Sequence, residues 1–514
     1  MKSSDIHLEA LIIGAGISGL CVAARLERAG MRSFLVLEKA GDVGGTWRDN
    51  NYPGCACDIP SHLYSLSFEP NPAWSQMFAP QGEILAYLRN MAARRGLMSR
   101  IRFCTTVQSA TWDEAAAMWR VRTTQGRNYT TRVLVSALGA LHHPAIPRLP
   151  GLEQFRGERF HSATWNHGYE LAGKRVAVIG TGASSIQFVP RIVDQVARLH
   201  LFQRTPPWIL PKANPVFGPE MQWRFRWLPL YRLGFRSRLF WVHEQRVHGF
   251  TDKPERMDKI EGFARALLER QVADPALRAR LTPDYAIGCK RLLISSDYYP
   301  ALQKPNAELV TEGIREVRAG SIVTTDGVER GVDALIFGTG FDTQNNLSRL
   351  DVRGRGGRTL GQTWSERTEA YAGTMISGFP NLFVMLGPNS GLTHNSQIFM
   401  IESQTRLILS ALKAMRQRGE RAIDVSKEAQ ADYNQELQGR LAHSVWQAGG
   451  CSNWYHDAAG NNTINWPGTS LEYFRLTRQL RISHFSFGSP ALASGKPSAA
   501  PVEPRLAPGE EGVT

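Results

Sequence analysis

The sequence lacks any hydrophobic segment long enough to cross a membrane. A transmembrane helix needs about 20 consecutive apolar residues, and no apolar run in the 514 residues reaches that length. The sequence continues into an apolar strand pattern at Leu11 to Ile13, so we expect no secretory signal. We therefore expect a cytoplasmic protein.

Cysteine is scarce, and its spacing excludes the usual metal and redox motifs. The chain contains neither a CxxC pair nor a zinc-ligand pattern. Cys55 and Cys57 are separated by one residue, and we interpret them as small loop residues in a reducing compartment. We therefore expect no metal site and no redox-active dithiol. The six positions are Cys21, Cys55, Cys57, Cys104, Cys289 and Cys451.

A nucleic-acid-binding motif is also absent, although the chain is basic. The net charge is +14, but Lys and Arg are dispersed, so we expect no nucleic-acid partner. The densest cluster, residues 223–246, is compatible with an anionic membrane surface. We favour a helical insertion whose aromatic side chains pack and whose arginines are solvated, and keep peripheral membrane contact as the weaker alternative. The cluster interleaves Arg224, Arg226, Arg232, Arg236, Arg238 and Arg246 with Trp223, Phe225, Trp227, Tyr231, Phe235, Phe240 and Trp241.

Two glycine turns with one common spacing are the most informative features that are present. Each follows a strand-like apolar run, and each is followed, 24 residues after its first glycine, by a charged residue, Glu38 or Arg204. One such match is weak evidence, but two complete matches rarely arise by chance. The turns are Gly14-Ala15-Gly16-Ile17-Ser18-Gly19 and Gly180-Thr181-Gly182-Ala183-Ser184-Ser185.

This spacing is typical of the Rossmann βαβ unit, in which the glycines let the backbone approach a pyrophosphate at a helix N-terminus. The residue at the end of the second strand contacts the adenosine ribose and distinguishes its 2′ substituent. A carboxylate accepts from a free 2′-hydroxyl, whereas arginine suits a 2′-phosphate. Glu38 therefore predicts FAD at the first turn, and Arg204 predicts NADPH at the second. Ser185 replaces the third glycine of the second turn but is still small enough for close packing of helix against strand.

The order of segments predicts an α/β fold with two Rossmann-like dinucleotide-binding domains and a helical insertion. Apolar segments at 133–138 and 334–340 continue the two sheets, and prolines between 144 and 150 mark a boundary. We expect an FAD domain at 1–148 and 378–487, an NADP domain at 149–213 and 301–377, the helical insertion at 214–300 and a disordered tail, rich in Pro, Ala, Gly and Ser, at 488–514.

The connection between the two units carries a longer motif. Phe155, Gly157, His161 and Trp165 follow the pattern FxGxxxHxxxW, and Asn166 comes next. Here the chain resembles the type I Baeyer–Villiger monooxygenases, in which Pro or Asp follows the Trp. The related flavin-containing monooxygenases usually lack that Trp. The resemblance implies that His161 lies at a hinge between the domains.

Three other segments support this resemblance. Residues 45–58 match GxWxxxxYPGxxxD, residues 290–291 match the family's Lys-Arg pair, and residues 453–455 are similar to its Ser-Trp-Tyr segment with Asn for Ser. The resemblance extends from about residue 8 to 475. It indicates the class of reaction but not the substrate.

The resemblance implies an FAD-dependent, NADPH-consuming monooxygenase that inserts one oxygen atom of O2 next to a ketone carbonyl, giving an ester or lactone. Reduced flavin would react with oxygen at its C4a carbon, and the resulting peroxide anion would attack the ketone. Arg291 would be the catalytic cation, because a guanidinium stays charged and offers several donors to the peroxide and the adduct. Asp58 would orient Arg291.

The resemblance also implies binding roles for other side chains. Arg204 and Lys290 would clamp the 2′-phosphate with Thr205 nearby, and Trp47 and Tyr64 would line the flavin. The expected FAD-binding residues are Gly14, Gly16, Ser18, Gly19, Glu38, Gly45, Thr46, Trp47, Asp58, Tyr64, Val107 and Gln397. The expected NADP-binding residues are Gly180, Thr181, Gly182, Ser184, Ser185, Arg204, Thr205, Lys290, Arg291 and Trp454.

Three alternatives remain at this stage. A flavin N- or S-monooxygenase would apply the same peroxide to a soft nucleophile such as a sulfide, although Trp165 and the Lys290-Arg291 pair favour the ketone. A non-oxygenating flavin reductase would normally need a redox cysteine pair. A nucleotide-sensing, membrane-associated binding protein would depend on residues 223–246 alone. The sequence indicates neither the oligomeric state nor the particular ketone.

Overall fold

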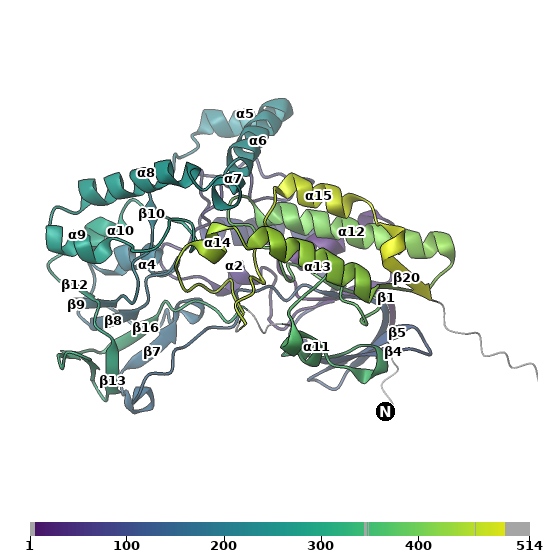
Figure 1. The fold of residues 1–514 in the computed structure, drawn as a ribbon, viewed down its shortest axis with the longest axis horizontal. Coiled ribbons are helices and arrows are strands. Elements are labelled where there is room, and N and C mark those ends of the chain that lie inside the picture. The colour runs from purple at the N-terminus through teal and green to yellow at the C-terminus, as the bar shows by residue number, and fades with distance from the viewer. Residues whose placement is uncertain (1–5, 344–346, 348, 458, 489–514) are drawn as a thin grey trace, which may run out of the picture.

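The computed structural model describes residues 6–343, 347, 349–457 and 459–488, which form two separate main sheets (Figure 1). Gly14 follows a strand of the first sheet, and Gly180 follows a strand of the second. The expected α/β class with two Rossmann-like units is therefore confirmed.

The first sheet has the strand order β17-β4-β5-β6-β1-β2-β3, and β18 also pairs with β6. Central strand β1 runs parallel to β2 and β6, and its second half, residues 10–13, is apolar and buried. Helix α1 (Ile17–Arg28) begins directly after the glycine turn and packs against α12 (Gln397–Arg418). The strands are β1 (Ile6–Ile13), β2 (Phe34–Leu37), β3 (Ile101–Arg102), β4 (Val107–Asp113), β5 (Met118–Thr123), β6 (Asn128–Ser136), β17 (Asp351–Arg353) and β18 (Leu382–Val384).

The second sheet has five parallel strands in the order β12-β9-β8-β16-β7. Helix α4 (Ser185–Ile192) follows the second glycine turn and contacts α10 (Tyr298–Leu302). The strands are β7 (Glu158–His161), β8 (Arg175–Ile179), β9 (Arg198–Phe202), β12 (Ala307–Val310) and β16 (Ala334–Phe337). A small antiparallel sheet of β13 (Ile314–Arg318), β14 (Ser321–Thr324) and β15 (Glu329–Gly331) lies beside it.

The segment expected to be helical, 214–300, is mainly helical. The short strand β10 (Ile209–Leu210) before it pairs with β11 (Leu293–Ile294) near its end. Figure 1 shows α5 and α6 projecting from the body of the molecule. Within the described ranges, the model contains no helix with the length and apolar character of a membrane span. The helices are α5 (Pro219–Trp227), α6 (Pro229–Glu244), α7 (Val247–Phe250), α8 (Arg256–Gln271) and α9 (Pro275–Leu281).

The chain returns to the first sheet earlier than the boundary expected at residue 378. Strand β17 already pairs with β4, because Val352 is buried in the core of the first unit. Residues 489–514 of the expected tail lie outside the described residues. The remaining elements of this part are α11 (Leu360–Glu366), α13 (Lys427–Leu441), α14 (Val445–Ala448), α15 (Ser470–Arg478), β19 (Ala422–Val425) and β20 (Phe485–Gly488).

Candidate active site

Both glycine turns open into one cavity of about 1450 Å³. Of the residues expected at FAD, its wall contains Gly14, Gly16, Ser18, Glu38, Gly45, Thr46, Trp47, Asp58, Tyr64, Val107 and Gln397. Of those expected at NADP, it contains Gly180, Thr181, Gly182, Ser184, Arg204, Thr205, Lys290, Arg291 and Trp454. Gly19 and Ser185 lie behind the turns in α1 and α4, outside the lining.

The first turn is a cradle that depends on glycine. Gly14 has a φ of 104°, and a Cβ atom there would lie 2.6 Å from the carbonyl oxygen of Ala137. A Cβ atom on Gly19 would lie 1.9 Å from the carbonyl oxygen of Gly14, so α1 packs directly on the turn. The buried Glu38 accepts a hydrogen bond from the Ala15 N–H at 2.8 Å. Its carboxylate is thereby held at the edge of the cavity.

Arg48 also lines the cavity, although the sequence did not single it out. Its Nη1 donates to Glu38 Oε1 at 3.1 Å, and its Nε donates to Asp49 Oδ1 at 2.8 Å. Burial opposes the charge of Arg48, but these two carboxylates outweigh that effect and raise its pKa. Position 48 is unspecified in the motif that spans it, so the spacing carried no signal for it.

The second turn repeats the first, but its charged residues come from two distant segments. Gly180 has a φ of 102°, and a Cβ atom there would lie 2.6 Å from the carbonyl oxygen of Gly338. The exposed Arg204 follows β9, whereas Lys290 enters the cavity from the last part of the helical insertion. Burial and the neighbouring charge of Arg204 lower the pKa of Lys290. Two adjacent cations of this kind suit a dianionic group.

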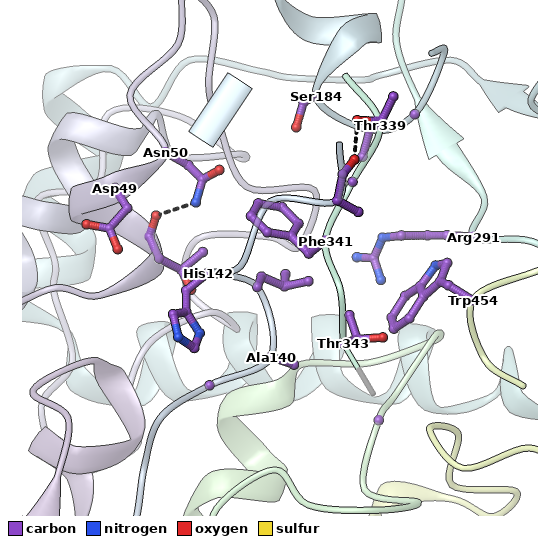
Figure 2. Close-up of a pocket in the computed structure, with 18 of the residues that line it drawn as sticks. Asp49, Asn50, Ala140, His142, Ser184, Arg291, Thr339, Phe341, Thr343 and Trp454 are labelled. Atoms are coloured by element: carbon purple, nitrogen blue, oxygen red, sulfur yellow. Dashed lines mark hydrogen bonds between the residues drawn. The ribbon is translucent and has the colours of Figure 1, made fainter. Parts of the chain in front are cut away.

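Arg291 and Asp58 bring two distant motifs together at the cavity wall. Arg291 donates to Asp58 Oδ2 twice, from Nε at 2.9 Å and from Nη2 at 2.6 Å. The charge of Asp58 raises the pKa of Arg291 in spite of its burial. Figure 2 shows the Arg291 guanidinium pointing toward Phe341, with Trp454 beside it. The ion pair therefore holds a permanent positive charge in a set direction at the cavity.

Two buried polar atoms on the cavity wall are further candidates for ligand contact. Tyr455 Oη and Thr393 Oγ1 have no hydrogen-bond partner among the described residues. Burial raises the pKa of Tyr455 to about 12, and the nearby Arg291 opposes that rise. Because buried polar groups are normally bonded, these two oxygens stand out, although each is itself closed off from solvent. Tyr455 was matched as part of a motif, but only Trp454 was expected at the site.

The FxGxxxHxxxW motif lies outside the cavity and packs against the second sheet. A Cβ atom on Gly157 would lie 2.6 Å from the Phe155 ring, which explains the glycine. The Trp165 ring lies 5.2 Å from that of Phe188, on the helix behind the second turn. His161 ends β7, and its Nδ1 accepts from the Ala163 N–H at 3.1 Å. Through Trp165, the motif therefore packs against α4, the helix that follows the second glycine turn.

Two segments connect the first sheet to the second, one near residue 145 and one near residue 340. They are hydrogen-bonded to each other, a contact that the sequence did not indicate. The Ala145 N–H donates to the Gly340 carbonyl at 2.9 Å, and Thr339 Oγ1 donates to the Ala145 carbonyl at 2.6 Å (Figure 2). Phe341, on the second connection, lies 5.5 Å from the His161 ring. The paired connections form part of the cavity wall and link it to the FxGxxxHxxxW motif.

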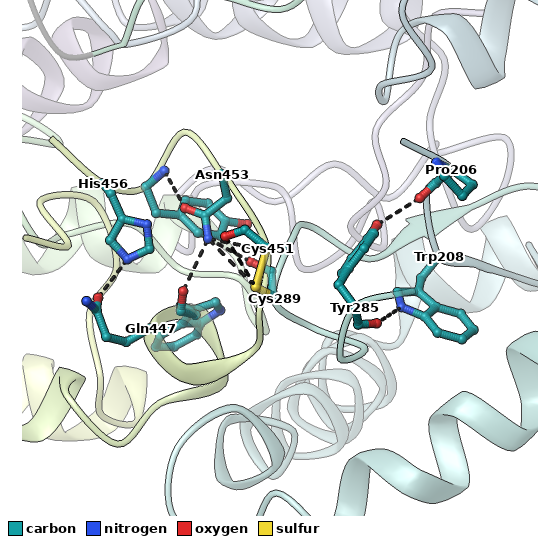
Figure 3. Close-up of a disulfide and its surroundings, with 10 residues drawn as sticks. Pro206, Trp208, Tyr285, Cys289, Gln447, Cys451, Asn453 and His456 are labelled. Carbon is teal, nitrogen blue, oxygen red and sulfur yellow. Dashed lines mark hydrogen bonds between the residues drawn. A yellow bond between two sulfur atoms is a disulfide. The ribbon is translucent and has the colours of Figure 1, made fainter. Parts of the chain in front are cut away.

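A disulfide between Cys289 and Cys451 was not expected from the sequence (Figure 3). The two cysteines are separated by 162 residues, so close-spacing motifs carried no signal for their pairing. Asn453 Nδ2 also donates to the Cys289 carbonyl at 3.1 Å. Because Cys289 directly precedes Lys290, both contacts attach the C-terminal loop with Trp454 to the Lys-Arg segment. Cys55 and Cys57 are free and buried.

The fold and the site define an oxidoreductase with two dinucleotide-binding units. Residues 11–226 match the family model described as pyridine nucleotide-disulphide oxidoreductase. A curated Baeyer–Villiger monooxygenase of Pseudomonas aeruginosa is 49% identical over 489 residues, covering 95% of this chain and 93% of that protein.

Solved structures agree with this result. An oxidized steroid monooxygenase bound to NADP is 32% identical with a TM-score of 0.83, covering 94% of this chain and 99% of that one. The OTEMO complex with FAD and NADP is 27% identical with a TM-score of 0.84, covering 94% and 100%. The chain belongs to the Baeyer–Villiger monooxygenase family.

Proposed function

We propose that this protein is an FAD- and NADPH-dependent monooxygenase that inserts one oxygen atom of O2 next to a ketone carbonyl, forming an ester or lactone. The observation that carries the proposal is the Arg291–Asp58 ion pair in a cavity that both glycine turns share. A hydrolase or a simple binding protein has no need for a fixed cation between two dinucleotide cradles.

The residues of the first unit fit FAD, and those of the second fit NADPH. When bound, the flavin supplies the reaction with oxygen, and NADPH supplies the hydride. Glu38 offers an acceptor to a ribose hydroxyl, and the Gly14 turn lets a pyrophosphate approach the N-terminus of α1. Arg204 and Lys290 form a pair of cations for the 2′-phosphate.

Arg291 acts where negative charge develops on the ketone oxygen as the new C–O bond forms. A guanidinium held in place by Asp58 stabilises that charge without reorganising. Asp58 is a positioning residue, because it reaches the substrate only through Arg291.

Purified protein supplied with NADPH, isotopically labelled O2 and a panel of ketones tests this function. We expect one labelled oxygen in the ester or lactone, and we expect Arg291→Ala to keep FAD but lose product formation. Arg175→Ala is the matched control, because Arg175 forms a similar two-bond pair with Asp333 outside the cavity. Product formation at the wild-type rate by Arg291→Ala would overturn the role of Arg291.

Sulfides belong in the same panel, because a sulfoxide without any ester would identify an S-monooxygenase instead. We propose a cytoplasmic location for the enzyme, where NADPH is regenerated.

A further inference from the structure

The hairpin formed by α5 and α6 exposes a large apolar face. We had expected its aromatic side chains to pack, but Trp227 is 64% exposed, Leu230 is 82% exposed and Trp241 is 52% exposed. Trp223 and Leu233 are also exposed. An apolar patch of this size on a projecting hairpin indicates an interaction surface rather than a packed insertion (Figure 1).

Other aromatic residues already attach the hairpin to the body. Phe217, Phe225 and Phe235 surround the ring of His62, at centroid distances of 5.6, 4.1 and 5.4 Å. Arg236 donates to the carbonyl of His62 from the same inner side. The exposed residues are therefore not needed to hold the hairpin in place.

The exposed side chains share one face of α6. Leu230, Leu233 and Trp241 lie at helical spacing, and Ser237 between them is exposed as well. The opposite side of α6 carries the inward-facing Arg236. Helix α6 thus carries an outward-directed apolar stripe in addition to Phe235 and Phe240, which pack against the body.

Positive charge borders the apolar face. Arg224, Arg226 and Arg238 are exposed on the two helices. Every residue of α5 and α6 is described, and their acidic side chains are Glu220, which pairs with Arg224, and the buried Glu244. Exposed Trp and Leu bordered by Arg is the composition of a surface that lies in the headgroup region of an anionic bilayer.

We propose that the α5–α6 hairpin docks the enzyme peripherally on an anionic phospholipid surface. A second copy of the chain is a poorer occupant, because both sides of a symmetric contact would carry the same positive charge. The net charge of +14 further favours an anionic partner. The hairpin does not line the cavity, so docking leaves the proposed site open.

Co-sedimentation with vesicles tests this proposal on the full flavin-loaded chain. We expect binding to phosphatidylcholine vesicles that contain phosphatidylglycerol, and at least about tenfold weaker binding to phosphatidylcholine alone or in high salt. Trp227→Glu/Leu230→Glu and Arg224→Gln/Arg226→Gln/Arg238→Gln should each lower binding by about the same factor. Val328→Glu is the matched control, because Val328 is an exposed apolar residue in the distant turn between β14 and β15.

Flavin content and ketone turnover in solution show that each variant is folded, since none of the substituted residues lines the cavity. Unchanged vesicle binding in the Trp227→Glu/Leu230→Glu variant overturns the proposal. A wild-type dimer that this variant converts to a monomer also overturns it, because the face would then be a subunit contact. Light scattering after gel filtration distinguishes these outcomes.

Discussion

The two glycine turns have the same backbone geometry although they belong to different sheets. Gly14 and Gly180 have φ values of 104° and 102°, and a Cβ atom on either would lie 2.6 Å from a carbonyl oxygen, that of Ala137 or of Gly338. Each of these carbonyls follows the strand beside the turn. The pyrophosphate cradle is thus one local design used twice.

The third position of each turn differs, and a neighbour compensates. In the first unit Gly19 packs beneath a turn whose neighbour is Ala137, whereas the second unit has Ser185 and Gly338. A Cβ atom on Gly338 would lie 1.9 Å from Ser185 Oγ, so the glycine leaves the space that the serine fills. In the second unit, Gly338 therefore accommodates the serine that replaces the third glycine.

The charged residues that follow the second strand of each unit, Glu38 after β2 and Arg204 after β9, differ in burial and in their partners. Glu38 is buried and bonded to the turn of its own unit, so the residue at the first ribose position is held by local structure. Arg204 is exposed, and its partner Lys290 comes from the last part of the insertion. Backbone geometry therefore makes a dinucleotide site, whereas the choice of dinucleotide in the second unit depends on long-range contacts.

Alanine at the first glycine of each turn should have the largest effect. Gly14→Ala should abolish FAD binding and Gly180→Ala should abolish NADPH oxidation with FAD retained, because each Cβ atom meets backbone that cannot move aside. Flavin absorbance and NADPH oxidation measure the two losses. Gly30→Ala is the control, since Gly30 has a φ of 83° but open space around its Cβ position. Retained FAD in Gly14→Ala would contradict the cradle.

Arg204→Ala should affect only the second unit. Loss of one charge-assisted contact of about 1.5 to 3 kcal/mol should raise the KM for NADPH roughly ten- to a hundredfold, with FAD content unchanged. Steady-state kinetics with NADPH and NADH measure the change in preference. Arg198→Ala, at the other end of β9, should leave the preference as it is. An unaltered preference in Arg204→Ala would refute the assignment.

Exchanging the small residues should make the second unit resemble the first. Gly338→Ala should destabilise the protein by about 1 to 3 kcal/mol, because the added methyl overpacks against Ser185. Adding Ser185→Gly should recover most of that loss. The midpoint of unfolding in guanidinium chloride is the measurement. Additive losses in the double variant would show that the two positions are independent.

The pH dependence of NADPH use should show the smallest effect and should come from the second unit alone. The pKa of Lys290 is lowered by burial and by Arg204, so Lys290 loses its proton at a lower pH than an ordinary lysine. The protonated form binds the phosphate, so the KM for NADPH should rise as pH rises through that lowered pKa. Lys290→Arg should remove the rise, because arginine stays charged. A rise that persists in this variant has another source.

Much of the fold and part of the site could be predicted from the sequence, because Rossmann turns are local. The glycines, the flanking apolar runs and the residue closing the second strand lie within about 25 residues of one another. The Lys-Arg pair and the Trp454 segment were located through resemblance to a family, since no local rule marks them. Arg48, Tyr455 and Thr393 were not singled out, because burial and hydrogen bonding define their place.

Expectations for the helical insertion show the same limit. Its helical character follows from composition and spacing, but which aromatic residues face the body depends on where His62 lies. The sequence analysis also missed two tertiary contacts for the same reason. One is the pairing of β17 with the first sheet, and the other is the contact between the segments near residues 145 and 340. A single sequence does not state which strand a short segment will join.

The sequence by itself determined the two βαβ units, their order and the sign of the charge at each ribose position, because all of these depend on neighbouring residues. Only the tertiary structure decided that Asp58 meets Arg291, that Lys290 lies beside Arg204 and that Cys289 joins Cys451 across 162 residues. Such pairs depend on how the whole chain packs. Burial of the two sheets and the insertion fixes which distant segments meet, and local propensity carries no information about that.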